Sequence, residues 1–67
     1  MSSFYKRDGN PRPGDRACTV LSWVTLVAKL VTDEEYTGPD FWIVEDDQGE
    51  YHMMCENEMV DIGYYGD

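Results

Sequence analysis

The sequence predicts an all-β fold for one small domain. Its 67 residues leave room for a single hydrophobic core. Residues 16–32 are rich in Val, Thr, Leu and Trp, which favour β-strands. Residues 41–55 contain two apolar runs separated by Asp46–Gly49, a pattern typical of a tight hairpin. An apolar share of 42% and an aromatic share of 13% indicate a packed core rather than a disordered chain.

The domain is expected to occupy residues 15–62. Residues 1–14 end in a run of Gly and Pro from Gly9 to Gly14, which predicts a flexible N-terminal arm leading into a turn. Residues 63–67 are expected to form an exposed C-terminal tail. We find no internal repeat.

Residues 16–32 are too long for one typical strand, so we expect two strands with a bend near Ser22 and Trp23. The four Val and three Thr in this segment lose side-chain freedom in a helix, which favours strands. A helix at about 18–31, packed on the following β-hairpin in an α+β fold, is the alternative, since Val20, Val24 and Val27 also lie at helical spacing.

Three segments in the second half follow one another in an informative order. Asp40–Val44 is an aromatic-led strand, Asp46–Glu50 is a tight turn, and Met54–Ile62 contains a polar 3₁₀-like turn followed by a short strand. In this order they resemble the corresponding parts of an SH3-like small β-barrel, over residues 15–62. The resemblance implies a five-stranded barrel. Peptide-binding and Tudor-type barrels further imply an aromatic site for a peptide or a methylated cation, here from Trp42, Tyr51 and Tyr36.

Charge is the most unusual property of the chain. Fourteen acidic and five basic residues give a formal charge of −9, and residues 30–67 contain twelve acidic residues and no Lys or Arg. Such a chain repels nucleic acid and anionic membranes and attracts basic protein surfaces. Trp23, on the more polar side of its segment, is a candidate interface anchor. The candidate acidic binding residues are Asp33, Glu34, Glu35, Asp40, Glu45, Asp46, Asp47, Glu50, Glu56 and Glu58.

Catalytic and metal sites are not expected. The single histidine, His52, with Cys18 or Cys55 would be the minimum for a Cys–His nucleophile, but no oxyanion-forming glycine segment accompanies it. The same three residues lack the paired short-spaced motifs of structural zinc sites, and residues 45–50 do not have the spacing of an EF-hand loop. We therefore expect no enzyme activity, no metal and no cofactor. The two cysteines are expected as reduced thiols, with a single disulfide as the alternative.

The predicted function is docking on the basic surface of a protein partner, for example a nucleic-acid-binding protein whose channel the acidic chain occupies as a decoy. Small phage-encoded inhibitors resemble this chain in size and charge, and that analogy suggests an inhibitor. The alternative is an SH3-like or Tudor-like module for peptides or methylated cations. With a polar N-terminus and no apolar stretch long enough to span a bilayer, the chain is expected to be cytoplasmic and to make no contact with membranes.

Overall fold

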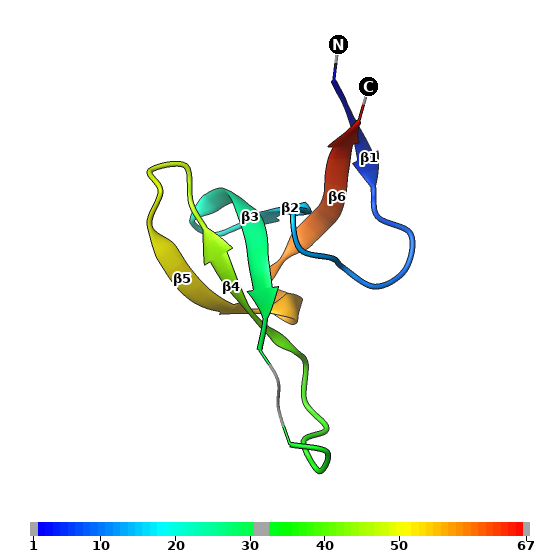
Figure 1. Ribbon diagram of the computed structural model, residues 1–67, viewed down its shortest axis with the longest axis vertical. Coiled ribbons are helices and arrows are strands. Elements are labelled where there is room, and N and C mark those ends of the chain that lie inside the picture. The colour runs from blue at the N-terminus through cyan, green and yellow to red at the C-terminus, as the bar shows by residue number, and fades with distance from the viewer. Residues whose placement is uncertain (1, 31–32, 67) are drawn as a thin grey trace.

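The computed structural model describes residues 2–30 and 33–66. Over these residues the chain forms six antiparallel strands in one open sheet, in the order β1-β6-β2-β3-β4-β5 (Figure 1). The elements are β1 (Ser3–Lys6), β2 (Arg16–Thr19), β3 (Ser22–Lys29), β4 (Phe41–Glu45), β5 (Tyr51–Cys55), the 3₁₀ helix η1 (Glu56–Glu58) and β6 (Val60–Gly66). The all-β prediction is confirmed, whereas the number of strands is six rather than five.

The alternative helix at 18–31 is wrong. Most of that segment lies in β2 and β3, which pair as a hairpin with Cys18 opposite Trp23, and residue 31 lies outside the described residues. The expected bend is a two-residue turn at 20–21, slightly earlier than predicted. Ser22 then adopts a φ of 110°, a conformation that side chains other than glycine rarely adopt.

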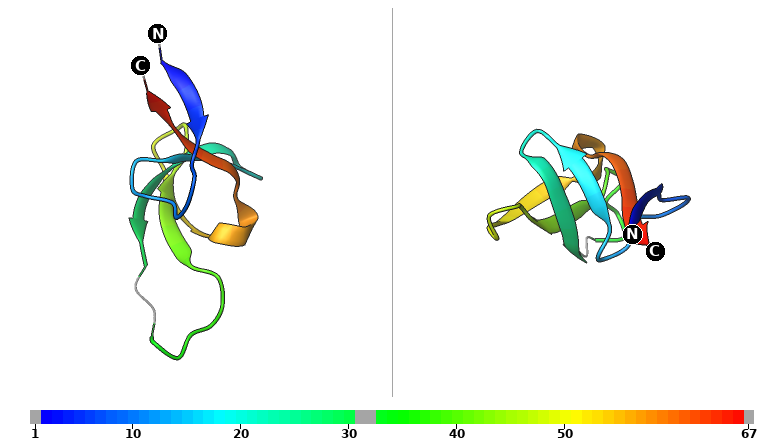
Figure 2. Two further views of the ribbon diagram at one scale, coloured as in Figure 1. Left: turned by 90° about the vertical axis from the view of Figure 1, so that its right-hand side faces the viewer. Right: turned by 90° about the horizontal axis from the view of Figure 1, so that it is seen from above.

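The β4–β5 hairpin and the 3₁₀ turn after it are confirmed. Gly49 has a φ of 84°, the left-handed conformation that a tight turn often requires. Along β4, Trp42 and Val44 are buried while their neighbours are partly exposed, so one face of the strand points into the core. The sheet bends around that core (Figure 2), which consists of Ala17, Val24, Leu26, Trp42, Val44, Met54 and Met59, with Ile62 packed against it.

Both ends of the chain differ from the prediction. Ser3–Lys6 is a strand rather than part of a flexible arm, because it pairs along β6, and β6 continues through Gly66 where a tail was expected. Gly63 makes this pairing possible, since a Cβ there would collide with the backbone of Tyr5 and the ring of Phe4. Aromatic contacts across the two strands further stabilise this pairing; the ring centres of Phe4 and Tyr65, for example, lie 5.3 Å apart.

A partly buried ion pair between Arg7 and Asp15 fixes the connection between β1 and β2. Asp15 is 2% exposed, and its carboxylate accepts hydrogen bonds of 2.9 and 2.7 Å from the Arg7 guanidinium and of 3.0 Å from the backbone N–H of Arg12. The hydrogen bonds from Arg7 lower the pKa of Asp15 despite its burial. The Arg7 guanidinium also lies 4.6 Å from the centre of the Tyr64 ring.

No helix within residues 2–30 and 33–66 has the length and hydropathy needed to cross a bilayer.

Candidate interaction surface

Three consecutive carboxylates lie on the long β3–β4 connection. Asp33, Glu34 and Glu35, which we call the acidic loop, are all exposed. The backbone N–H of Tyr36 donates to the carbonyl of Asp33 at 3.0 Å, and the Tyr36 hydroxyl donates to the carbonyl of Pro39 at 2.8 Å. The connection is thus held by contacts that leave the three carboxylates free. Within the described residues none of the three has an ion pair or a side-chain hydrogen bond.

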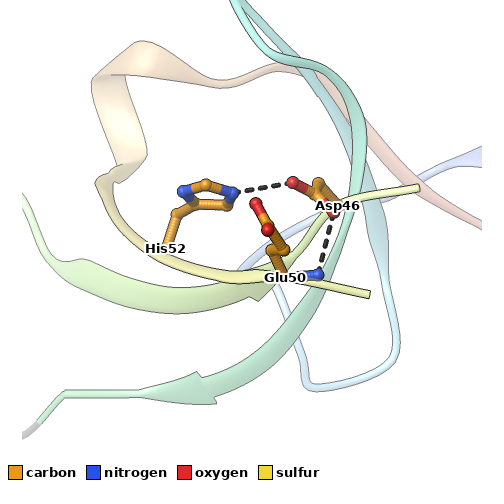
Figure 3. A group of neighbouring side chains, drawn as sticks. All are labelled: Asp46, Glu50 and His52. Atoms are coloured by element: carbon orange, nitrogen blue, oxygen red, sulfur yellow. Dashed lines mark hydrogen bonds and ion pairs between the residues drawn. The ribbon is translucent and has the colours of Figure 1, made fainter. Parts of the chain in front are cut away.

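Four further carboxylates lie at the β4–β5 turn. These residues, Glu45, Asp46, Asp47 and Glu50, are called the hairpin tip. Asp46 Oδ1 accepts from the backbone N–H groups of Gln48 at 2.8 Å and Glu50 at 3.0 Å, so this carboxylate closes the turn. Its Oδ2 shares a hydrogen bond of 2.8 Å with His52 Nε2 (Figure 3). These contacts lower the pKa of Asp46, and the hydrogen bond with His52 has the largest effect.

Several candidate binding residues therefore have structural partners. Asp47 pairs with Arg16 at 3.4 Å, and Asp40 pairs with Lys29 at 2.9 Å. The pair with Asp40 raises the pKa of Lys29. The remaining two belong to η1: Glu56 accepts a hydrogen bond of 2.8 Å from the buried indole of Trp42, whereas Glu58 is exposed.

The acidic loop and the hairpin tip, which together contain seven of the ten candidate acidic residues, occupy separate regions rather than one face. The acidic loop precedes β4 and the hairpin tip follows it, so the two regions lie at opposite ends of the strand (Figure 1). In that view the loop extends below the sheet, along the longest dimension of the molecule, which measures 43 Å.

The predicted aromatic site is not assembled. Trp42 is 1% exposed and belongs to the core, because its side chain alternates inward with that of Val44. Tyr51 pairs with Glu45 across the hairpin and lies on the opposite, outer face, where it is 64% exposed. Trp23, the predicted anchor, is half-buried and packs edge-on against Phe4, with ring centres 5.5 Å apart. It contributes to the outer surface near β1 but is not a freely projecting side chain.

Among the described residues, the cysteine, histidine and carboxylate side chains do not form the Cys–His combinations considered from the sequence. Cys18 is partly exposed, Cys55 is buried, and the two are free cysteines in this structure. Within the described part of the chain, the one group of three potential metal ligands is Asp46, Glu50 and His52, whose ligand atoms lie within 4.8 Å of one another. A cation there would compete with the hydrogen bonds that already close the turn.

Sequence reasoning missed a groove beside the N-terminal segment. It encloses about 420 Å³ between residues 6–11 and the η1–β6 region. Lys6 and Arg7 line it, as do Glu56 and Asp61, and Lys6 already pairs with Asp61 at 3.7 Å. This mixture of paired charges selects no particular ligand. No local pattern could have indicated the groove, since its walls are distant in sequence.

No family model, curated protein or solved structure matches the chain. The charge, exposure and hydrogen bonding of the chain's own residues are therefore the basis for its proposed function.

Proposed function

We propose that the chain is a non-enzymatic interaction domain that docks on a basic protein surface, and that the acidic loop makes the main electrostatic contact. One observation carries this proposal: Asp33, Glu34 and Glu35 are exposed together on a projecting connection and have no partner within the described residues. Carboxylates with no internal role add self-repulsion to a small domain, and a partner's cations relieve that repulsion.

The distribution of cations supports the same site. Four of the five basic residues, Lys6, Arg7, Arg16 and Lys29, already pair with carboxylates of this chain. None of these four carboxylates belongs to the acidic loop. The field of the loop is therefore available to steer a basic partner, and this attraction weakens as salt screens it.

The partner class that fits best is a nucleic-acid-binding protein. Such proteins carry clustered Lys and Arg for phosphate contacts, and a row of protein carboxylates competes for the same cations. In this role the chain acts as a decoy or inhibitor. The methylated-cation alternative loses its central residue, because Trp42 lies in the core.

The test is a pull-down from the host cell with the immobilised chain, at salt concentrations of about 50 and 500 mM, followed by affinity measurement on the purified partner. The variant Asp33→Asn, Glu34→Gln, Glu35→Gln should weaken binding strongly. The matched control Asp8→Asn, Glu45→Gln, Asp47→Asn removes the same charge from positions outside the acidic loop and should weaken binding less.

Three results would count against the proposal. Affinity that is flat between the two salt concentrations excludes an electrostatic contact. Equal losses in the two triple variants assign the effect to net charge rather than to the acidic loop. A partner that binds the chain and duplex DNA at the same time excludes the decoy role.

A further inference from the structure

The outer edge of β5 has unused backbone hydrogen-bonding groups. β5 ends the strand order and lies at the periphery of the sheet in both Figure 1 and the right-hand view of Figure 2. The bonds from Asp46 N–H to Glu50 C=O (2.9 Å) and from Glu56 N–H to Asp40 C=O (2.8 Å) fix the ladder at both ends of the hairpin. Antiparallel pairing alternates, so His52 and Met54 bond to β4.

It follows that the N–H and C=O groups of Tyr51 and Met53 point away from β4. Neither residue makes a backbone hydrogen bond to another segment within residues 2–30 and 33–66. The two residues are 64% and 63% exposed, with their side chains on the outer face of the sheet, so this edge is open to solvent. An open edge with apolar side chains and no Pro, Lys or bulge is a template for another strand.

Charge at the two ends of β5 selects the kind of strand. Glu50 immediately precedes it, and the exposed Glu58 follows it in η1. No Lys or Arg occurs anywhere in residues 30–67. A second copy of this chain is disfavoured, because it would bring two β5 edges with like charges together at a net charge of −9 per chain.

We propose that β5 accepts an extended segment of a basic partner as an added strand, with apolar residues beside Tyr51 and Met53 and Lys or Arg at both ends. A five-residue strand spans about 17 Å, which sets the spacing between the two basic ends. Main-chain hydrogen bonds supply affinity in this mode, and the flanking carboxylates supply selectivity. This inference rests on the proposed basic partner and names the segment of it that binds.

The test uses a synthetic peptide with two Lys or Arg at each end and alternating Val and Thr between them. A matched control peptide has the same side chains but carries N-methyl groups on the backbone nitrogens that face β5. We expect the first peptide to bind and to shift the amide NMR signals of Tyr51 and Met53. The methylated peptide should bind about tenfold more weakly or worse, a factor that corresponds to 1.4 kcal/mol.

Two variants examine the edge from the side of the protein. Met53→Pro removes an N–H that points away from β4, so the β4–β5 ladder stays intact while the added strand loses a donor. Met53→Val removes the same side chain and keeps the N–H. Peptide affinity should fall in the Pro variant and persist in the Val variant; if the Pro variant does not fold, the methylated peptide still decides.

Equal affinity for the two peptides would overturn strand addition. It would do so even if peptide binding weakens with salt, a result that still supports a basic partner. Failure of both peptides to bind at low salt would overturn it as well. Concentration-dependent dimerisation with NMR shifts at β5 would assign the edge to a second copy. In contrast, the proposed function would be contradicted if the affinity for the full-length partner did not change with salt. The two failures are therefore distinguishable.

Discussion

The acidic loop and the hairpin tip have similar charge but use it differently. At the tip, Asp46 closes the turn through two backbone N–H groups and contacts His52, and Asp47 pairs with Arg16. In the loop, the carboxylates of Asp33, Glu34 and Glu35 have no such contacts within the described residues. An acidic cluster in sequence therefore combines two kinds of residue, those that the fold requires and those that it leaves for a partner.

Asp15 is the carboxylate that the fold requires most. Its substitution is expected to have the largest effect on stability. Asp15→Asn removes the charge that accepts two hydrogen bonds from the partly exposed Arg7 guanidinium, which should destabilise the fold by about 2 kcal/mol. This amount is comparable with the total stability of so small a domain. Urea unfolding measures it. Asp8→Asn, an exposed position with the same charge change, should stay within about 0.5 kcal/mol.

The pH dependence of stability provides a second measure of the same carboxylate. The pKa of Asp15 is lower in the folded chain, mainly through its hydrogen bonds with Arg7, so the unfolded chain binds the proton more readily. Its contribution is present above the unfolded pKa of about 3.9 and is lost as the pH falls through the folded value. Comparable losses in Asp8→Asn and Asp15→Asn, or an unchanged acid profile in Asp15→Asn, would contradict this role.

The next effect concerns the hairpin tip. Asp46→Ala removes the acceptor of two turn N–H groups and the partner of His52, and should lower the melting temperature by roughly 5 °C. Asp47→Ala removes only an exposed ion pair of 3.4 Å and should change it little. Thermal melts of both variants make the comparison. If Asp46→Ala and the wild type have the same melting temperature, the Asp46 carboxylate is as dispensable to the fold as those of the acidic loop.

Local patterns in the sequence predicted the middle of the fold better than its ends. Residues 41–55 alternate and contain Gly49, so their hairpin was predictable. The turn at 20–21 has no Gly, Asn or Pro, and its strain falls on Ser22, so the bend was predicted two residues too late. The β1–β6 pair depends on Gly63 allowing a distant strand to approach, which no local pattern indicates. The resemblance to SH3-like barrels stays a prediction.

The candidate site was predictable in composition but not in role. The charge count correctly indicated exposed carboxylates at 33–35. It could not separate them from Asp46 or Glu56, because their partners, His52 and Trp42, are determined by the fold. Trp42 was assigned to a surface site although alternation along β4 places it inward. The exposed edge of β5 becomes visible only once the strand order is known.

The smallest expected effect on stability belongs to the acidic loop. Asp33→Asn, Glu34→Gln, Glu35→Gln removes no ion pair or side-chain hydrogen bond within the described residues, so the free energy of unfolding should change by no more than about 0.5 kcal/mol. Reduced self-repulsion makes any change a stabilisation, largest at low salt and smaller at high salt. Urea titrations at two salt concentrations measure it. A clear destabilisation would show that the loop carboxylates have a structural role, and the contrast with the hairpin tip would fail.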